Sequence, residues 1–419
     1  MAQTVAPSTM RDYGYDARSF AQFLEGRSVD VLSAQQDDLL AYRDFKMTVS
    51  ERPVSPATWR RNVVVVRGIF SFLVRAGLRD TEPWIRVGSR TVLDVPIHQE
   101  MVVRALSQDQ WFSFRDIGLG GQLPNGDLDG SWRGQHPVRS RAAAEVALTT
   151  GMRLAEWRTL LNCELPPMAD TDGASVVLQA CAKYQKRRRV FVPRSALKEI
   201  DLYRRTERRR VVRASHAALW KRRHELAVVR GIDRAKGKIS FDIGEQRKVM
   251  AIENIPPQLR RIMVVDGDGG LESLSLFVGR GGLPPGHRNW LRTFELANIR
   301  MAGFTDQLPG MPVAITPHDL RHTFAVVLLR SLMDVAFQRE TSRRDGGGHG
   351  SLSEHIAVNP LLTLQRLLGH SSPATTMVYL RHVEDTDALV QRCFESWMLD
   401  DRDYADHILT EQMRIADAG

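Results

Sequence analysis

The sequence predicts a mainly α-helical protein with one small β-hairpin, divided into an N-terminal helical unit and a larger α+β unit. Three observations support this fold class. Apolar residues recur at helical spacing along most of the chain, β-branched residues flank one short basic turn, and a loosely patterned stretch separates the two units. With 419 residues, of which 43% are hydrophobic, the chain is long enough to form two cores.

The N-terminal unit is predicted to be a helical domain over residues 1–85. Its first helix begins near Ser8, its second covers Gln36–Met47, and its third starts after Ser55 and stops at Gly77. The first turns of the third helix are polar, which fits either a surface that meets a DNA backbone or the outer face of an ordinary bundle. The residues concerned are Thr58, Arg60, Arg61 and Asn62.

Residues 86–106 lose this periodicity and are interpreted as an interdomain linker. The second domain, residues 107–419, starts with Ser107 as the N-cap of a helix and includes a further helix over Ser140–Thr149. A glycine interrupts the pattern soon afterwards, so Arg153 is expected at the end of an element rather than on an open surface.

A β-hairpin is predicted next, because β-branched runs over Ser175–Ala180 and Arg189–Val192 flank a basic turn. The residues from Ser195 to about Arg230 are expected to be helical and very basic. Residues 231–270 mix strand-like pieces with turns, and we interpret them as an insertion without an assigned role.

Beyond the insertion, Leu274–Gly286 is predicted to be a strand that runs into a Gly/Pro turn, and Asn289–Met301 to be a helix. A further helix starts at Pro317 and holds the motif HDLRH. A Gly-rich loop over residues 338–358 and a C-terminal tail over residues 384–419 complete the domain.

The stretch NPLLTLQRLLGHSSPATTMVYLRH predicts two short adjoining helices. Asn359 starts the first and Gly369 ends it, which leaves His370 just beyond the helix terminus. The second helix starts at Pro373, and Tyr379 is expected on its later turns. The chain thus presents an imidazole and a phenol on neighbouring helices, although a buried helix-turn-helix with an ordinary core tyrosine gives the same local pattern.

Basic residues outnumber acidic residues by 58 to 49, and the net charge of +9 suits a polyanionic partner. They concentrate between Lys183 and Lys236, in the runs KYQKRRR, RRTERRR and KRR. A solvated helix face explains one such run, whereas three of them favour contacts with phosphates.

Other classes of protein are disfavoured. The three cysteines lie too far apart for a zinc pattern or a disulfide framework, and we expect small buried side chains at Cys163, Cys181 and Cys393. We expect a soluble, cytoplasmic protein without membrane contact, because there is no signal-peptide pattern and no run of about eighteen apolar residues. No metal or other cofactor is predicted, because HDLRH lacks the glutamate that metalloproteases place beside the first histidine.

The groups that carry chemistry come in a fixed order: Arg153 in TGMRLAEW, Lys183 in the hairpin, His318 and Arg321 in HDLRH, His370 in LLGH, and Tyr379. A phosphodiester under displacement gathers negative charge on its non-bridging oxygens, and guanidinium groups match those oxygens in charge and geometry. Such groups can replace the metal ions of other phosphoryl-transfer sites. A tyrosine can attack where cations favour its phenolate, and lysine or histidine can protonate the leaving oxygen.

In order and spacing, TGMRLAEW, HDLRHTFA and LLGHSSPATTMVYLRH resemble the motifs of the tyrosine recombinases, also called the phage integrase family. The resemblance covers the catalytic domain from about Leu106, and the N-terminal unit is similar to the SAM-like core-binding domain of that family. It implies a site-specific DNA recombinase or integrase. Tyr379 would attack the scissile phosphate, form a 3′-phosphotyrosyl link and free a 5′-hydroxyl, without ATP or metal.

The resemblance also implies roles and partners. Two arginines would hold the phosphate, two histidines would assist proton transfer and a lysine would be the general acid: Arg153 and Arg321, His318 and His370, and Lys183. Glu156 would orient its neighbours. The implied partners are double-stranded DNA sites, three further subunits in a tetramer on two sites, and accessory recombination proteins, at a nucleoid location. Leu389–Trp397 in the tail is the candidate contact with a neighbouring subunit.

Three residues near these motifs raise separate questions. Tyr184 stands where the family commonly has a glycine, so the turn geometry stays open and Lys186 rivals Lys183 as the general acid. Tyr203 lies among arginines but lacks an LLGH-like partner upstream, so a surface position is expected. His322 is expected to be a hydrogen-bonded core residue, and we assign it no catalytic role from the sequence.

Two other functions fit parts of this pattern. A type IB topoisomerase uses similar chemistry, and products from one site and from two sites would separate it from a recombinase. A catalytically silent DNA-binding regulator would keep the fold, and trapping a covalent complex would decide against it. The target sequence, the direction of the reaction and the choice between integration, transposition and chromosome resolution are left open.

Overall fold

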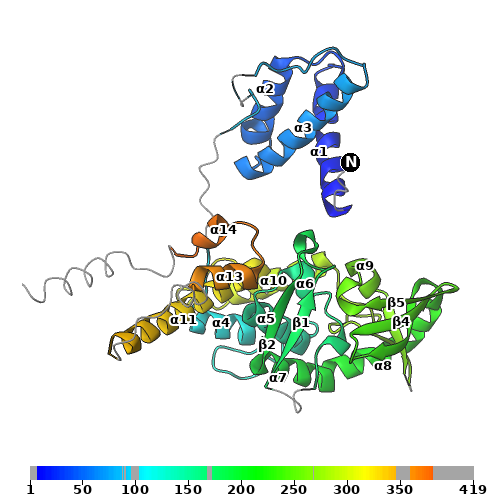
Figure 1. Ribbon diagram of the computed structural model, residues 1–419, viewed down its shortest axis with the longest axis vertical. Coiled ribbons are helices and arrows are strands. Elements are labelled where there is room, and N and C mark those ends of the chain that lie inside the picture. The colour runs from blue at the N-terminus through cyan, green and yellow to red at the C-terminus, as the bar shows by residue number, and fades with distance from the viewer. Residues whose placement is uncertain are drawn as a thin grey trace, which may run out of the picture. The chain divides into compact units, whose positions relative to one another are not determined.

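The computed structural model describes residues 7–86, 88, 91–95, 103–167, 172–267, 269–345 and 359–380. Contacts divide the chain into two compact units, Met1–Val102 and Val103–Gly419, and the boundary falls within residues 86–106. Figure 1 shows the first unit as a small group of helices and the second as helices combined with two small sheets. The prediction of a mainly helical fold with little β-structure is confirmed.

The N-terminal unit is a helical bundle around an aromatic core that includes Phe20, Tyr42 and Trp59. Its elements are α1 (Pro7–Gly26), α2 (Gln36–Asp44), a π-helical turn (Phe45–Val49) and α3 (Pro56–Arg75). The start of α3 follows the predicted rules, because Ser55 Oγ accepts a hydrogen bond from the Thr58 amide and proline occupies the first turn.

The polar residues at the start of α3 do not all face outward. Asn62 is buried, accepts a hydrogen bond from Tyr42 Oη and donates one to the Thr58 carbonyl oxygen. Arg61 forms an ion pair with Asp16 at 2.7 Å. Asn62 therefore belongs to the bundle core rather than to an outer surface, because its amide is satisfied inside the unit.

The first half of the second unit alternates helices with one hairpin. Its elements are α4 (Gln108–Ser113), a π-helical turn (Phe114–Leu119), α5 (Pro137–Thr150), α6 (Leu154–Trp157), β1 (Gly173–Leu178), β2 (Arg188–Pro193), α7 (Arg194–Tyr203), a second π-helical turn (Arg204–Arg208) and α8 (Arg209–Lys221). Ser107 caps α4, since its Oγ accepts a hydrogen bond from the Gln110 amide at 3.2 Å.

The second half adds a sheet and the helices of the later motifs. Its elements are β3 (Ala227–Asp233), β4 (Lys238–Ile243), β5 (Gln246–Ala251), α9 (Pro257–Arg260), β6 (Met263–Gly267), β7 (Gly270–Ser273), α10 (His287–Ala302), α11 (Pro317–Asp345), α13 (Pro360–Leu368) and α14 (Pro373–Met377).

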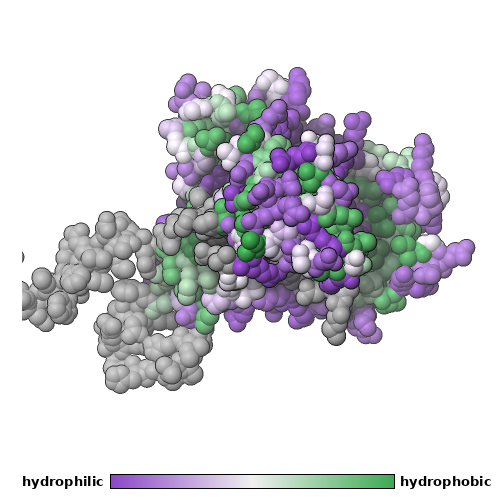
Figure 2. Space-filling view, turned by 90° about the horizontal axis from the view of Figure 1, so that it is seen from above, coloured by the Kyte–Doolittle hydropathy of each residue, from purple (hydrophilic) through white to green (hydrophobic). Residues whose placement is uncertain are grey.

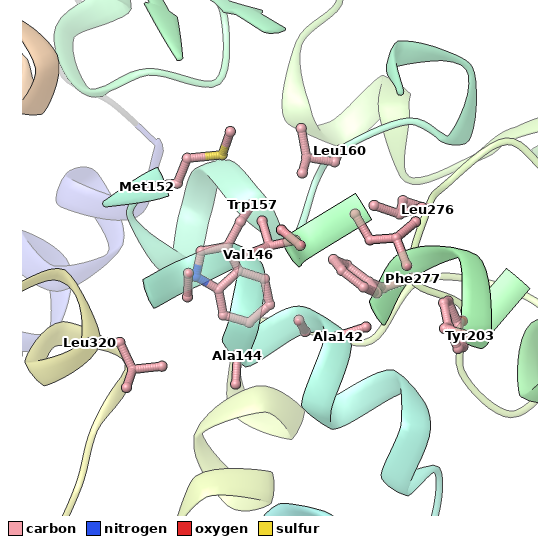
Figure 3. Packing of buried hydrophobic residues seen from close by; sticks show 14 of the residues in the cluster. Ala142, Ala144, Val146, Met152, Trp157, Leu160, Tyr203, Leu276, Phe277 and Leu320 are labelled. Atoms are coloured by element: carbon pink, nitrogen blue, oxygen red, sulfur yellow. The ribbon is translucent and has the colours of Figure 1, made fainter. Parts of the chain in front are cut away.

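Helix α5 is the centre of the second unit. It is buried on nearly all sides, with Ala142, Ala144 and Val146 fully inaccessible, as expected of a helix surrounded by other elements. Figure 3 shows these side chains beside Trp157, with Phe277 and Tyr203 continuing the same core.

Tyr203 lies inside this core, so the prediction of a surface position was wrong. Its exposed fraction is 1%, and its hydroxyl oxygen accepts a hydrogen bond from the Val278 amide at 2.9 Å. Burial raises the pKa of this phenol to about 12, so the phenol stays protonated inside the core. The surface position was predicted because arginines surround Tyr203 in the sequence, but some of these arginines are structural too.

Two arginines of the predicted phosphate-binding run RRTERRR are structural. Arg204 donates to the side chain and carbonyl oxygen of Asn162, and buried Arg208 donates to the carbonyl oxygens of Ser273, Ser275 and Leu276. Burial lowers the pKa of both guanidinium groups. This part of the basic segment therefore holds the chain of the second unit together rather than facing DNA.

The predicted hairpin is present. Strands β1 and β2 pair in antiparallel register from Gly173 opposite Pro193 to Leu178 opposite Arg188. The turn that joins them contains two consecutive non-glycine residues in the left-handed region, Tyr184 at φ 59° and Gln185 at φ 54°. Tyr184 thus adopts the conformation for which glycine is favoured, at an energetic cost to the backbone.

The segment interpreted as an insertion is a five-stranded sheet with strand order β5-β4-β3-β6-β7, in which β3 and β6 are parallel. It is wider than residues 231–270, because helix α8 ends at Lys221 and β3 starts at Ala227. It has a hydrophobic core of its own, which includes Phe241 and Met263. The β-branched pair Val228 and Val229 outweighed the basic, helix-like pattern at this point.

Two further boundaries differ from the predictions. Leu274–Gly286 forms no strand, since Ser275 makes one isolated bridge with Leu161. Helix α11 continues to Asp345, so the Gly-rich loop predicted from residue 338 does not begin there, and residues 346–358 lie outside the described part. Helix-favouring residues before the glycine run, such as Gln338, carry the helix onward.

Among the described residues, no helix is long and apolar enough to span a membrane. Figure 2 shows that hydrophilic side chains dominate the face seen from above, while hydrophobic side chains form small separate groups between them. The mean hydropathy of −0.28 agrees with such a surface.

Candidate active site

Helix α11 supplies three side chains of the site from its first two turns. Its start is fixed by Asp319, which accepts hydrogen bonds from the Thr316 amide at 2.7 Å and from the Arg104 guanidinium at 3.0 Å. Because residues three or four apart share a helix face, His318, Arg321 and His322 project toward the same region.

A close approach of α5 and α11 positions Arg321. Gly151 ends α5 at φ 60°, and a Cβ atom there would lie 2.3 Å from the Phe324 ring. Glycine is required at this position for both reasons. The approach lets Arg321 Nη1 donate to the Gly151 carbonyl oxygen at 2.5 Å, while Nη2 donates to that of Leu368 at 2.8 Å.

His370 follows α13 as the sequence predicted. Asn359 Oδ1 accepts a hydrogen bond from the Leu362 amide, and Gly369 ends the helix in the left-handed conformation at φ 67°. His370 Nε2 lies 3.3 Å from Arg321 Nη2, and its Nδ1 lies 3.0 Å from Thr376 Oγ1.

The protonation of His370 follows from these contacts. Burial, reinforced by Arg321, lowers the pKa of His370 to about 4, so the ring is neutral at pH 7. Since a guanidinium group only donates, Nε2 is the acceptor and Nδ1 carries the proton toward Thr376. His370 can therefore stabilise the Arg321 guanidinium, by accepting its hydrogen bond, without adding a positive charge of its own.

Tyr379 packs directly against this histidine. It is 1% exposed, its ring is stacked on that of His370 with centroids 6.2 Å apart, and its Oη lies 3.0 Å from His322 Nδ1. Burial raises the pKa of Tyr379, whereas Arg321 and Arg153 act in the opposite direction. The phenol is therefore protonated in the free protein and faces cations that favour its phenolate.

The position of Tyr379 along the chain differs slightly from the prediction. Helix α14 ends at Met377, so Tyr379 follows the helix rather than occupying its later turns. The chain bends there because Tyr379 is buried in a cluster that includes Leu364 and Leu368 of α13.

One carboxylate organises the arginines of the site. Glu156 is 1% exposed and binds Arg188 in a bidentate pair at 2.9 and 2.5 Å. It also accepts hydrogen bonds from the Arg153 amide at 2.7 Å and from Arg153 Nη1 at 3.4 Å. Burial alone would raise the pKa of Glu156, but Arg188 and then Arg153 more than offset this and hold the pKa below its ordinary value.

Sequence reasoning missed Arg188, although a signal existed. The residues of β2 alternate between buried and exposed, and Arg188 falls on the buried face with Val190 and Val192. An arginine on the inward face of a strand needs buried acceptors, and an acidic side chain is the strongest of these. Glu156, in the motif TGMRLAEW, is that partner.

The hairpin turn brings Lys186, and not Lys183, to the site. Lys183 is exposed, and its Nζ lies 5.0 Å from the ring centroid of Tyr184. Lys186 Nζ instead donates to the His370 carbonyl oxygen at 3.3 Å. Because Tyr184 and Gln185 occupy the left-handed region, the turn directs the later lysine inward.

His318 lies at the edge of the cluster. Its side chain is exposed, and its ring packs edge-on against that of His322, with centroids 4.4 Å apart. Partial burial and then Arg321 lower the pKa of His318. The hydrogen-bond partner of Tyr379 Oη in the described structure is His322 instead.

The structure thus gathers most of the predicted site. Arg153, Arg321, His370 and Tyr379 converge, His318 borders them, and Lys183 stays apart in the free protein. The described residues contain no group of His, Cys, Asp or Glu side chains arranged to hold a metal ion. The tail, including Leu389–Trp397 and Cys393, lies outside the described residues.

Comparisons with known proteins show what the chain is similar to. Residues 1–77 match the family model "Phage integrase, N-terminal SAM-like domain". The chain is 24% identical over 381 residues to tyrosine recombinase XerD of Mycobacterium tuberculosis, covering 90% of this chain and 87% of the relative. It is also 24% identical over 377 residues to tyrosine recombinase XerC of Chromohalobacter salexigens, covering 90% and 86%.

Solved structures give more distant likenesses. The Tn1549 transposon integrase in complex with a circular intermediate DNA aligns with a TM-score of 0.48 at 14% identity and covers 90% of each chain. The XerH site-specific recombinase bound to difH aligns with a TM-score of 0.43 at 14% identity, covering 89% of this chain and 73% of that one. In its ordered motifs, its matched N-terminal domain and its relatives aligned over nearly the whole length, the chain is similar to the tyrosine recombinase, or phage integrase, family.

Proposed function

We propose that the protein is a site-specific DNA recombinase that cuts and rejoins DNA through a 3′-phosphotyrosyl intermediate. The observation that carries this proposal is the convergence of Arg153, Arg321 and His370 around the phenol of Tyr379. These side chains come from α6, α11 and the segments after α13 and α14, which are distant in the sequence and meet in the fold.

The charges of the site suit a phosphodiester. Arg153, Arg188 and Arg321 lie close enough to influence one another, and Glu156 is the carboxylate that pairs with the first two. Burial and then Arg153 lower the pKa of Arg321 to about 9, which shows that the cluster destabilises its own cation. A bound phosphate relieves this repulsion, and the extra charge of the transition state relieves it further.

The attack itself needs no cofactor. The Tyr379 oxygen forms a bond to phosphorus while the bond from phosphorus to the 5′ oxygen breaks, so the energy of the phosphodiester is kept in the protein–DNA link. Arg153 and Arg321 hold the non-bridging oxygens, and neutral His370 accepts a hydrogen bond from Arg321 beside them. The freed 5′-hydroxyl of a partner duplex then attacks the link and restores the tyrosine.

Lys186 is the general acid that the free protein favours for the leaving 5′ oxygen. Its ammonium donates to the His370 carbonyl oxygen, beside the cluster, whereas the ammonium of Lys183 lies over the Tyr184 ring. If DNA binding turns the hairpin and brings Lys183 inward instead, substitution of Lys183 and not of Lys186 will slow cleavage.

The partners follow from this reaction. Strand exchange between two duplexes needs two cuts on each duplex, and we propose a tetramer on two DNA sites with the tail of each subunit on its neighbour. The tyrosine recombinase relatives, the DNA-bound structural neighbours and the net charge of +9 support DNA as the partner. Binding should weaken steeply with salt, since lysine and arginine displace counterions from the backbone.

The decisive experiment traps the covalent link. Duplexes that the purified protein retains from a randomised library are synthesised with a nick at successive positions, so that a short strand diffuses away after cleavage. We expect a denaturant-resistant protein–DNA adduct, with the modified peptide containing Tyr379. In Tyr379→Phe, duplex binding is retained and the adduct is absent. An adduct that persists in this variant assigns the nucleophile elsewhere.

A second measurement separates recombination from relaxation of supercoils. A plasmid with two copies of the selected duplex should give deletion or inversion products, whereas a plasmid with one copy should give none. Relaxation of the one-site plasmid without two-site products would contradict the recombinase assignment and leave the covalent chemistry in place.

A further inference from the structure

The hydrogen-bond partner of Tyr379 Oη is the second histidine of HDLRH, to which no catalytic role was assigned from the sequence. His322 Nδ1 lies 3.0 Å from Tyr379 Oη, and both side chains are buried, with exposed fractions of 4% and 1%. A contact of this length is a full hydrogen bond rather than a packing neighbour. One of the two groups therefore donates a proton to the other.

His318 is the other imidazole on this helix face, and it lies differently. It is exposed on the first turn of α11, and its ring meets the ring of His322 edge-on at 4.4 Å. Among the described residues, the hydrogen bond to the phenol comes from His322, four residues further along the same face. The two histidines thus form an ordered pair, with His322 between His318 and the phenol.

We infer that His322, rather than His318, accepts the phenolic proton of Tyr379 during strand cleavage and returns it during rejoining. This role rests on the proposed recombinase function. In cleavage, the bond from Oη to phosphorus forms, the bond from phosphorus to the 5′ oxygen breaks, the phenolic proton moves to His322 Nδ1, and the leaving oxygen takes a proton from the general acid. Rejoining reverses each transfer, so protons and electron pairs balance.

The surroundings of His322 keep it ready to accept. Burial lowers the pKa of His322 to about 4, so the ring is neutral and Nδ1 can hold a lone pair toward the phenol. The groups that act on it are His318 and Arg321, which disfavour its cation, Asp319, which favours it, and Arg104 in the segment before α4, which disfavours it. A phosphate beside Arg321 adds negative charge and raises the proton affinity of His322 when the proton must move.

The first test needs no DNA. The free protein is labelled with ¹⁵N-histidine, and His322 is assigned by comparison with His322→Gln. We expect a neutral ring at pH 7 with Nδ1 unprotonated and hydrogen-bonded, and a clear shift of the Nδ1 resonance in Tyr379→Phe. A proton resident on Nδ1, or a resonance unchanged in Tyr379→Phe, overturns the inference.

The second test is kinetic and uses a matched pair, His322→Asn and His318→Asn. Asparagine can keep a hydrogen bond at the position of Nδ1, but it cannot take up the proton. In single-turnover cleavage of the nicked, library-selected duplex at pH 7, we expect about 100-fold slower adduct formation in His322→Asn, the usual size of a lost proton acceptor. Its rate should rise with pH, because hydroxide ions replace the acceptor.

The matched variant decides between the two imidazoles. His318→Asn should slow the same step less than His322→Asn and keep the pH profile of the wild type. If His318→Asn is the slower variant, or if His322→Asn cleaves at the wild-type rate, the assignment is overturned. Melting temperatures and duplex affinities of both variants exclude misfolding as the cause.

Failure of the inference and failure of the proposed function give different results. A wild-type protein that forms no adduct with any selected duplex overturns the function and this role with it. A wild-type adduct whose rate and pH profile survive in His322→Asn overturns the role alone.

Discussion

Two equally buried arginines in the second unit have opposite surroundings. One is Arg260, at the end of α9 between strands β5 and β6, and the other is Arg321, in the candidate active site. Each is 2% exposed and donates to backbone carbonyl oxygens. Arg260 also pairs with buried Glu164 at 2.7 Å. Arg321 has no such carboxylate partner in the described structure and meets His370 instead.

The pKa values show what this difference means. Burial disfavours the cation of Arg260, but Glu164 and the neighbouring thiols outweigh it, so the pKa of Arg260 is raised. Burial and Arg153 together lower the pKa of Arg321 to about 9. Arg260 is therefore a satisfied structural ion, whereas Arg321 has no carboxylate of its own, since Glu156 pairs with Arg188 and Arg153. A bound DNA phosphate would supply that negative charge in the function proposed above.

Replacing Arg321 tests the functional side of the comparison and should have the largest effect. In Arg321→Met we expect adduct formation to fall by about 10³-fold or more, equal to roughly 4 kcal/mol of lost transition-state stabilisation. Stability should change by less than about 1 kcal/mol, because the lost hydrogen bonds are offset by relief from Arg153 and Arg188. Single-turnover cleavage and urea unfolding measure the two quantities. A large loss of stability would make Arg321 structural.

Replacing Arg260 should give the reverse result. Arg260→Met leaves Glu164 buried without a partner, so the free energy of unfolding should fall by about 3–5 kcal/mol. Cleavage per folded molecule should stay at the wild-type level. The matched control is the double variant Arg260→Met with Glu164→Leu, which removes both charges and should recover much of the loss. No recovery would mean that the carbonyl contacts of Arg260, rather than its charge, stabilise the sheet.

Acid should lower the stability of the protein through two buried histidines of the candidate active site. Burial lowers the pKa of His322 and of His370 to about 4, below the ordinary value of 6.5. The unfolded chain then binds more protons between those values, so stability is present above pH 6.5 and is lost as the pH falls toward 4. Each histidine contributes up to about 3 kcal/mol. Urea unfolding at several pH values should show this slope, and His370→Gln should reduce it. An unchanged slope would exclude His370 as its source.

Binding of a simple anion at the site should stabilise the protein, and this is the smallest of the expected effects. Sulfate in the low millimolar range should raise the melting temperature of the wild type by a few degrees, since ligand at several times its dissociation constant adds about 1 kcal/mol. The increase should disappear in Arg153→Ala, whose guanidinium is partly exposed at the site. Chloride at equal ionic strength is the control. Equal stabilisation by both salts would point to general screening.

Local rules were enough to predict the elements that carry the motifs. A cap at Asn359, a glycine at Gly369 and the proline at Pro317 fixed helices α13 and α11, and all are present. The hairpin also follows from β-branched residues on either side of a turn. These signals depend on residues close together in the chain, which a single sequence displays directly.

Side-chain partners across the fold could not be predicted in the same way. Arg188 and Glu156 are 32 residues apart, and their pairing depends on how the hairpin packs against α6. The inward turn of Lys186 depends on two left-handed residues that no propensity favours. The positions of Tyr203 and Arg208 were predicted wrongly, because a basic run is typical of a surface. Buried carbonyl oxygens can satisfy an arginine as well as solvent does.

Gly369 has a consequence for engineering this enzyme. A Cβ atom at this position would lie 3.1 Å from Arg188 Cδ, and the backbone there has φ 67°. A single added methyl group would therefore press on Arg188, which holds Glu156. Because Glu156 also pairs with Arg153, the effect would reach the site from a residue that is not one of the reacting groups. Gly369→Ala offers a graded way to detune cleavage while every reacting side chain remains in place.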